Sequence, residues 1–171
     1  MTAWVDQLKE GLPEYAKDTK LNLDAVIKRS SLAPEEAEAI ALAAAFATGN
    51  GKLVTFIQSG VADTKERDAA LTAGSIMAQN NVWYPYVEMA DDENLKGLPA
   101  QLRMNAIANH GGTTKDKFEA YALIASIIGK CHFCVNGHAE TLKQEGYTSE
   151  QLKDLGRIAS VVNALSKVLN A

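Results

Sequence analysis

The stretch that decides the fold is residues 118–146, which read FEAYALIASIIGKCHFCVNGHAETLKQEG. Apolar side chains recur at helical spacing along its first half, from Phe118 to Ile128. Gly129 interrupts this pattern, and Gly146 ends a second amphipathic segment that begins near Cys131. The stretch therefore predicts two helices joined by a tight corner, with the pair Gly111-Gly112 as the boundary before them.

The first half of the chain contains a partial copy of this pattern. Residues 38–44 (EAIALAA) match residues 119–125 (EAYALIA) at five of seven positions, and each copy precedes an interruption and a further helix. This similarity indicates a duplicated helical hairpin whose first copy lacks the cysteines. Because both segments are rich in alanine, a match of this length by chance is the alternative.

Most of the remaining chain also carries helical patterns. Pro34 at a first turn and Gly49 as a stop predict a helix that ends at Thr48. Asp63 and Glu66 have the spacing of a capping box for a helix over 64–79, which we expect to break at Asn80-Asn81 and Pro85. The best strand candidate, residues 53–57, is short and isolated. We therefore expect an all-α fold in a single domain spanning residues 1–171.

Composition narrows the class of protein. The chain has 171 residues, 47% hydrophobic and 22% charged, with a net charge of −4, which is typical of a globular protein and not of a nucleic-acid binder. The first ten residues lack the basic and apolar regions of a signal peptide, and the longest apolar runs reach about half a membrane span. We therefore expect no membrane partner, no nucleic-acid partner and a cytoplasmic location.

The last helix carries two apolar stripes, which places it centrally in the core or at a subunit interface.

The candidate catalytic residues lie in the second predicted hairpin. On a helix with about 100° per residue, Cys131, Cys134 and His138 fall within roughly 60° of one another. A Cys-x-x-Cys pair near a helix N-terminus can close a disulfide, and the helix dipole favours the thiolate there. His138 can act as a base toward the Cys134 thiol. Glu119 is the best candidate to orient that histidine, and a solvated helix glutamate is the alternative.

Other uses of the two cysteines fit less well. A zinc site would need His132 as a fourth ligand, yet on a helix His132 points about 100° away from Cys131. Covalent haem attachment needs a histidine directly after the second cysteine, where this chain has Val135. A thioredoxin needs a βαβ context that the chain lacks. Thiol–disulfide redox chemistry is favoured, with zinc binding and inert buried cysteines as the alternatives.

Several motifs together resemble the alkyl hydroperoxide reductase D (AhpD) family, which belongs to the carboxymuconolactone decarboxylase-like superfamily. They are residues 102–109 (LRMNAIAN), Phe118-Glu119, Cys131-x-x-Cys134-x-x-x-His138 and, in the first half, residues 80–84 (NNVWY). The resemblance extends from about Leu21 to the end of the chain. It implies an all-helical, generally oligomeric protein, trimeric in AhpD itself, that agrees with a duplicated helical architecture.

The resemblance also implies an activity and the residues that perform it. A dithiol–disulfide cycle would reduce the partner peroxiredoxin AhpC with electrons from dihydrolipoamide-type donors on a lipoyl-bearing protein, with weak direct reduction of organic hydroperoxides. Cys134 would be the reacting thiol, Cys131 its disulfide partner and proton donor, and His138 with Glu119 the proton relay. No metal and no bound cofactor would be required.

One position departs from the family pattern. Members often carry histidine directly before the second cysteine, whereas this chain has Phe133 there and a histidine one place earlier. No catalytic role is therefore carried over to His132. The remaining alternatives are a general disulfide reductase of the same fold without an AhpC partner, a zinc-stabilised helical binding module and a non-redox decarboxylase-like relative.

Overall fold

The computed structural model describes residues 3–110 and 112–171, and these residues contain helices and no strand. The boundary expected at Gly111 lies outside the described residues. The helices, in chain order, are α1 (Ala3–Glu10), the 3-10 helix η1 (Glu14–Ala16), α2 (Lys17–Lys28), α3 (Pro34–Thr48), α4 (Gly51–Gln58), α5 (Thr64–Ala90), α6 (Glu93–Lys96), α7 (Ala106–Asn109), α8 (Lys115–Gly129), α9 (His132–Gln144) and α10 (Ser149–Val168). The predicted all-α fold is confirmed.

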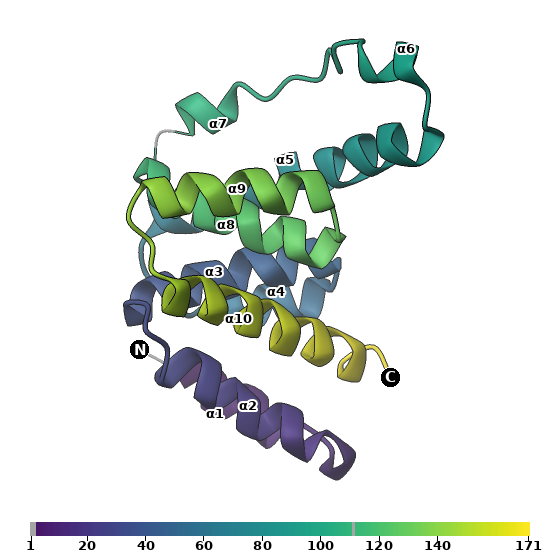
Figure 1. The fold of residues 1–171 in the computed structure, drawn as a ribbon. Helices are drawn as coiled ribbons and strands as arrows, with labels where there is room; N and C mark the ends of the chain where they lie inside the picture. The colour runs from purple at the N-terminus through teal and green to yellow at the C-terminus, as the bar shows by residue number, and fades with distance from the viewer. Residues whose placement is uncertain (1–2, 111) are drawn as a thin grey trace.

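The helices are arranged around α3. This helix packs against α5, α8 and α10, while α1 and α2 lie beyond α10 at the opposite end from α9 (Figure 1). A long connection that carries α6 and α7 arches over the end of the molecule where α9 lies, and it returns the chain from α5 to α8 (Figure 1). None of the described helices combines the length and the apolar character needed to cross a membrane.

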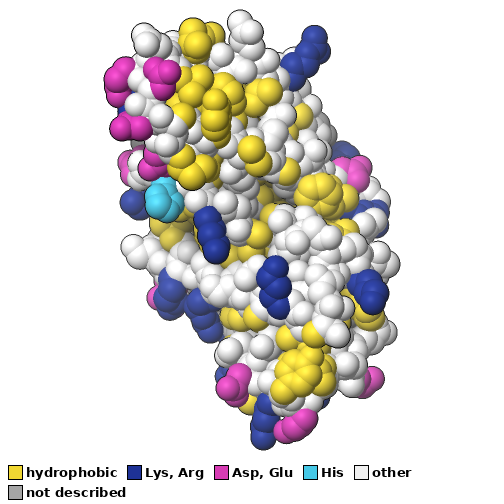
Figure 2. Space-filling view, turned by 90° about the vertical axis from the view of Figure 1, so that its right-hand side faces the viewer, with side chains coloured by type: hydrophobic (Ala, Val, Ile, Leu, Met, Phe, Trp, Pro, Cys, Tyr) yellow, Lys and Arg dark blue, Asp and Glu magenta, His cyan; other side chains and the backbone are white. Residues whose placement is uncertain are grey.

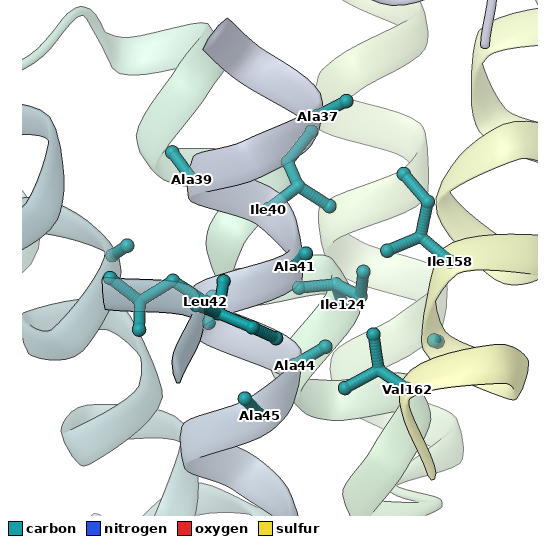
Figure 3. Close-up of a cluster of buried hydrophobic side chains, with 14 of the residues drawn as sticks. Ala37, Ala39, Ile40, Ala41, Leu42, Ala44, Ala45, Ile124, Ile158 and Val162 are labelled. Carbon is teal, nitrogen blue, oxygen red and sulfur yellow. The ribbon is translucent and has the colours of Figure 1, made fainter. Parts of the chain in front are cut away.

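The core of the molecule is built from small side chains on α3. Every residue from Ala37 to Ala45 is buried, and most of them are alanines. Alanine lets neighbouring helices approach closely on several sides, and larger side chains then fill the remaining space. Figure 3 shows Ile124 from α8, with Ile158 and Val162 from α10, directed toward this helix.

The two hairpins, α3–α4 and α8–α9, have the same local construction, in line with the similarity of their sequences. Each first helix ends in a left-handed residue, Gly49 with φ 75° and Lys130 with φ 57°, 81 positions apart. The next residue caps the second helix: the Asn50 side chain accepts a hydrogen bond from the Leu53 N–H, and the sulfur of Cys131 accepts one from the N–H three residues later.

The best strand candidate is helical, as the expected all-α fold requires, and one local expectation, the break in α5, is wrong. Residues 53–57 lie in helix α4, because Asn50 caps it and Leu53 and Ile57, four residues apart, face the core together. Helix α5 does not break but runs unbroken through Asn81 and Pro85. Pro85 cannot donate to the carbonyl of Asn81, yet the Asn81 side chain donates to the Ala125 carbonyl of α8 at 3.1 Å, a tertiary contact that holds this turn in place.

Glu66 joins α5 to α8 and does not close the capping box that its spacing suggests. Only Asp63 caps α5, while Glu66 accepts hydrogen bonds from Tyr121 (2.6 Å), Thr113 (2.9 Å) and Lys117 (3.0 Å). Burial raises the pKa of the Glu66 carboxyl, but these hydrogen bonds outweigh it and hold the pKa below its usual value. The ionised carboxylate therefore stabilises the contact between α5 and α8.

We expect Glu66→Gln to lower the free energy of unfolding by about 1–3 kcal/mol at pH 7, because charge-assisted hydrogen bonds are lost. Since the folded-state pKa lies below the unfolded one, the stabilisation is present above about pH 4.3 and disappears as the pH falls through the folded value. Urea unfolding at pH 7 and at about pH 3 measures the difference, which should shrink at the lower pH.

Glu140→Gln is the matched control for this substitution. Glu140 is exposed, and its two contacts are long: an ion pair with Lys143 at 3.7 Å and a hydrogen bond accepted from Gln144 at 3.5 Å. Its replacement should change the free energy of unfolding by less than about 0.5 kcal/mol at either pH. Equal effects of the two substitutions would contradict a special role for Glu66.

Candidate active site

The corner between α8 and α9 places the two cysteines at the start of a helix. Cys131 is the N-cap of α9, and its backbone N–H donates to the Ser126 carbonyl at 3.2 Å. Its sulfur accepts a hydrogen bond from the Cys134 N–H, also at 3.2 Å. Cys134 therefore lies in the first turn of α9, where free backbone N–H groups and the helix dipole favour a negative charge.

The structure joins the two cysteines in a disulfide bond. The Cα atoms of Cys131 and Cys134 are 5.3 Å apart, within the range for disulfides. Cys131 is fully buried and Cys134 is 5% exposed. The two sulfurs are thus held away from bulk water. Of the two cysteines, Cys134 is the one that retains some exposure, and it faces a pocket.

His138 and Glu119 form a hydrogen-bonded pair next to this disulfide. The Nδ1 atom of His138, one turn after Cys134 on α9, lies 2.7 Å from Oε2 of Glu119 on α8. Both side chains are mostly buried, at 17% and 13% exposure. On its other side, Nε2 of His138 lies 3.2 Å from the sulfur of Met77 on α5.

One pocket of about 340 Å³ contains Cys134, Glu119 and His138. The structure thus brings these three sequence-identified residues together, with Cys131 behind Cys134. His132 does not line this pocket; its exposed side chain faces the opposite side of α9. No catalytic role is carried over to His132 from the resemblance, and its position gives it no access to the Cys134 sulfur.

Helix α5 supplies pocket residues that the sequence analysis did not identify. Met77, Asn80 and Tyr84 line the pocket from this helix. They are three and four residues apart and lie on one helical face. A prediction of α5 as a continuous helix would have revealed that face, whereas the expected break at Asn80-Asn81 hid it.

A larger apolar groove, of about 740 Å³, lies beside the pocket. Its walls include Trp83, Val87 and Leu98, and His132 lies at its edge. Figure 2 shows hydrophobic side chains gathered in the upper part of this face, where α6 and the end of α5 lie. The groove gives the surface next to the cysteines a mainly hydrocarbon character.

Two stacked aromatic rings separate the groove from the pocket. Tyr84 and Phe133 lie with ring centroids 4.5 Å apart and line both hollows. Phe133, the residue that departs from the family pattern, is 63% exposed. A molecule in the groove therefore reaches the Cys134 sulfur past this aromatic pair.

The arrangement is suited to thiol–disulfide exchange. It combines a buried disulfide at a helix N-terminus, which stabilises the thiolates formed on opening, with a histidine held by a carboxylate in the same pocket. Among the described residues, no group of three His, Cys, Asp or Glu side chains has the geometry to hold a metal ion.

Comparisons with known proteins identify the family of the chain. The carboxymuconolactone decarboxylase family model matches residues 94–171, which include both cysteines. Over 166 residues the chain is 42% identical to the alkyl hydroperoxide reductase AhpD of Coxiella burnetii, covering 94% of this chain and 93% of that protein. It is 40% identical to the AhpD of Maricaulis maris, with 98% of each chain covered, and 39% identical to that of Rhodospirillum centenum, with 98% of this chain and 91% of the relative covered. The chain belongs to the AhpD family.

The corner between α8 and α9 also depends on a close approach to α5. A Cβ atom on Gly129 would lie 2.1 Å from the side-chain nitrogen of Asn81 and 2.7 Å from its Cβ atom. No side chain fits there unless Asn81 moves and loses its hydrogen bond to Ala125. Gly129 therefore allows the cysteine-bearing corner to lie against α5.

We expect Gly129→Ala to lower the free energy of unfolding by about 1–3 kcal/mol, through overpacking at this corner. Gly156→Ala on α10 is the control, because a Cβ atom there meets nothing within 4 Å. Alanine in a helix interior should leave the stability unchanged or raise it by up to about 1 kcal/mol. Thermal unfolding of both variants tests the difference, and a tolerated Gly129→Ala would contradict the close approach.

Proposed function

We propose that this protein is an antioxidant thiol–disulfide oxidoreductase with alkyl hydroperoxide reductase activity, based on a Cys131–Cys134 dithiol/disulfide cycle. The observation that carries the proposal is the disulfide at the start of α9 in the same pocket as a histidine held by Glu119. The alkyl hydroperoxide reductase names of the relatives support the substrate class.

The oxidative half of the proposed cycle begins with the dithiol. His138, oriented by Glu119, accepts the proton of the Cys134 thiol, and the thiolate attacks the outer oxygen of a hydroperoxide. The O–O bond breaks, the alkoxide takes up a proton from water as an alcohol, and Cys134 becomes a sulfenic acid while His138 keeps the proton it accepted. The thiol of Cys131 then displaces water from that sulfur and closes the disulfide. Two thiols and one hydroperoxide thus give a disulfide, an alcohol and water.

The reductive half uses a dithiol donor, which we propose to be of the lipoamide type on a lipoyl-bearing protein. The apolar groove next to Phe133 supports this proposal, because a lipoyl arm is a hydrocarbon chain that ends in two sulfurs. The chemistry takes place on the chain's own thiols, so no bound cofactor takes part in the cycle.

The proposed protein partner is the peroxiredoxin AhpC, whose disulfide the Cys134 thiolate would attack in place of a peroxide. We further propose a homotrimer in the cytoplasm. Exposed apolar side chains on α5, such as Val82 (70%) and Met89 (77%), support an oligomer, because isolated subunits rarely expose several large apolar groups together.

We expect Cys134→Ser to abolish peroxide-dependent oxidation of the donor, because no thiol then faces the pocket. Glu119→Gln should slow it by about 10–100-fold, since His138 loses its charged partner. The assay follows dihydrolipoamide oxidation with an alkyl hydroperoxide, with and without AhpC. Unchanged turnover in Cys134→Ser would contradict the proposed cycle.

Glu38→Gln is the matched control for Glu119→Gln. Glu38 occupies the corresponding position on α3, where it is buried and accepts a hydrogen bond from Trp4 at 3.3 Å. Its substitution should leave turnover unchanged. An equal loss of turnover in the two variants would show that the effect of Glu119→Gln is structural.

The same assay separates the alternative functions. A general disulfide reductase without an AhpC partner would oxidise the donor with small disulfides but gain nothing from added peroxiredoxin. A zinc-stabilised binding module would contain stoichiometric zinc that is lost when the thiols are alkylated. The proposed enzyme should need AhpC for rapid turnover and retain its activity after treatment with a chelator.

A further inference from the structure

The imidazole of His138 has a second contact that the proposed cycle does not use. While Nδ1 faces Glu119, Nε2 lies 3.2 Å from the Met77 sulfur. Met77 is fully buried on α5. This contact belongs to the disulfide form of the protein, in which neither cysteine carries a proton.

The chemistry of the two neighbours fixes how many protons the pair holds. A thioether sulfur has no proton and can only accept a hydrogen bond, so the contact is a hydrogen bond in the form of the ring that carries a proton on Nε2, and the proposal takes that form. If Glu119 is ionised, Nδ1 also carries a proton and the ring is an imidazolium. If the ring is neutral, Nδ1 is bare and Glu119 must donate to it. In both cases His138 and Glu119 together hold two protons.

The other groups around the ring do not change this result. Of the described residues that line the pocket, Glu119 is the only carboxylate, and Tyr84 on α5 is the only other titratable side chain outside α9. The segment between α6 and α8 contributes no titratable group to the pocket. Lys115 on α8 forms an ion pair with Glu145, which is the main reason that its pKa is raised, and Glu119 raises the pKa of this lysine to a smaller extent.

We propose that Met77 is a positioning residue that keeps a proton on Nε2 of His138 while the disulfide is closed, so that this proton is available to the Cys134 sulfur on reduction. The inference rests on the proposed function, and it adds a residue of α5 to a site that the sequence places entirely on α8 and α9.

The reductive steps balance with this proton. A thiolate of the dithiol donor attacks the Cys134 sulfur, the S–S bond breaks, and Cys131 leaves as a thiolate that takes a proton released by the donor. The donor's second thiolate then attacks its own sulfur in the mixed disulfide, and the Cys134 thiolate leaves. Nε2 of His138 protonates this thiolate, and the proton of the donor's second thiol passes to water, so that Nε2 is free to accept the Cys134 thiol proton in the oxidative half. The donor loses two electrons, and the disulfide gains them.

Two measurements on the disulfide form test the proposal. Long-range ¹H–¹⁵N spectra should show Nε2 of His138 protonated at pH 7. The rate constant for reduction of the disulfide by dithiothreitol, expressed per dithiothreitol thiolate, should decline as the pH rises and the Nε2 proton is lost. Met77→Leu nearly keeps the side-chain volume and removes the hydrogen-bond acceptor. The decline in rate should therefore move to lower pH by about 0.5–1 unit. At pH values above the decline, the variant should react about 3- to 10-fold more slowly than the wild type.

Two further variants decide whether the acceptor is responsible. Met77→Gln restores an acceptor oxygen and should return the decline toward its wild-type pH. Met104→Leu removes the neighbouring thioether, which accepts a hydrogen bond from Asn80 and not from His138, and should not shift the decline even if it changes the rate. Any of four results would overturn the proposal. Nε2 could be unprotonated in the wild type, or the decline could stay at the same pH in Met77→Leu. The leucine and glutamine variants could behave equally, or Met104→Leu could shift the decline as much as Met77→Leu.

These measurements are independent of hydroperoxide turnover, because dithiothreitol is the only reactant. If the chain failed to reduce alkyl hydroperoxides while Nε2 was protonated and the Met77→Leu shift was present, the proposed function would be wrong and the role of Met77 would stand. Normal turnover with an unprotonated Nε2 would lead to the opposite conclusion.

Discussion

The close packing of α3 against its neighbours is the constraint on which the rest of the structure depends. Because α3 is buried from Ala37 to Ala45, it has no face for solvent, and α5, α8 and α10 must all lie against it. Its alanine side chains let these helices approach closely (Figure 3). The positions of α5 and α8 relative to each other follow from their shared contact with α3, and the site lies where these two helices meet α9.

The site arises from a difference between two otherwise similar hairpins. In the first, Asn50 caps the helix and Leu53 and Ile57 face the core. The residues 81 positions later are Cys131, Cys134 and His138, so a capping amide and two apolar side chains are replaced by two sulfurs and an imidazole. The buried glutamates differ in the same way, because the one on α3 meets the indole of Trp4 and the one on α8 meets an imidazole.

Local signals in the sequence are sufficient for much of this architecture. Helix α3 begins at Pro34 and ends at Thr48, as the proline and the glycine around it predict, because these residues act on their own backbone. The break expected in α5 was wrong because the contact that keeps Asn81 helical comes from Ala125, far away in the chain. Helical spacing is a local property, so the sequence could place the two cysteines and His138 on one helical face. The wall of the pocket that α5 forms depends on tertiary packing and could not be predicted.

The sulfur of Cys131 takes part in two equilibria at once. It is one half of the disulfide, and it is also the atom that accepts a hydrogen bond from the Cys134 N–H in the first turn of α9. Since a thiolate, a thiol and a disulfide sulfur accept hydrogen bonds with different strength, the end of α9 has a different stability in each redox state. By thermodynamic linkage the reverse also holds: whatever tightens or loosens the first turn of that helix changes the free energy of reducing the disulfide by the same amount. The helix is thus part of the redox couple as well as its support.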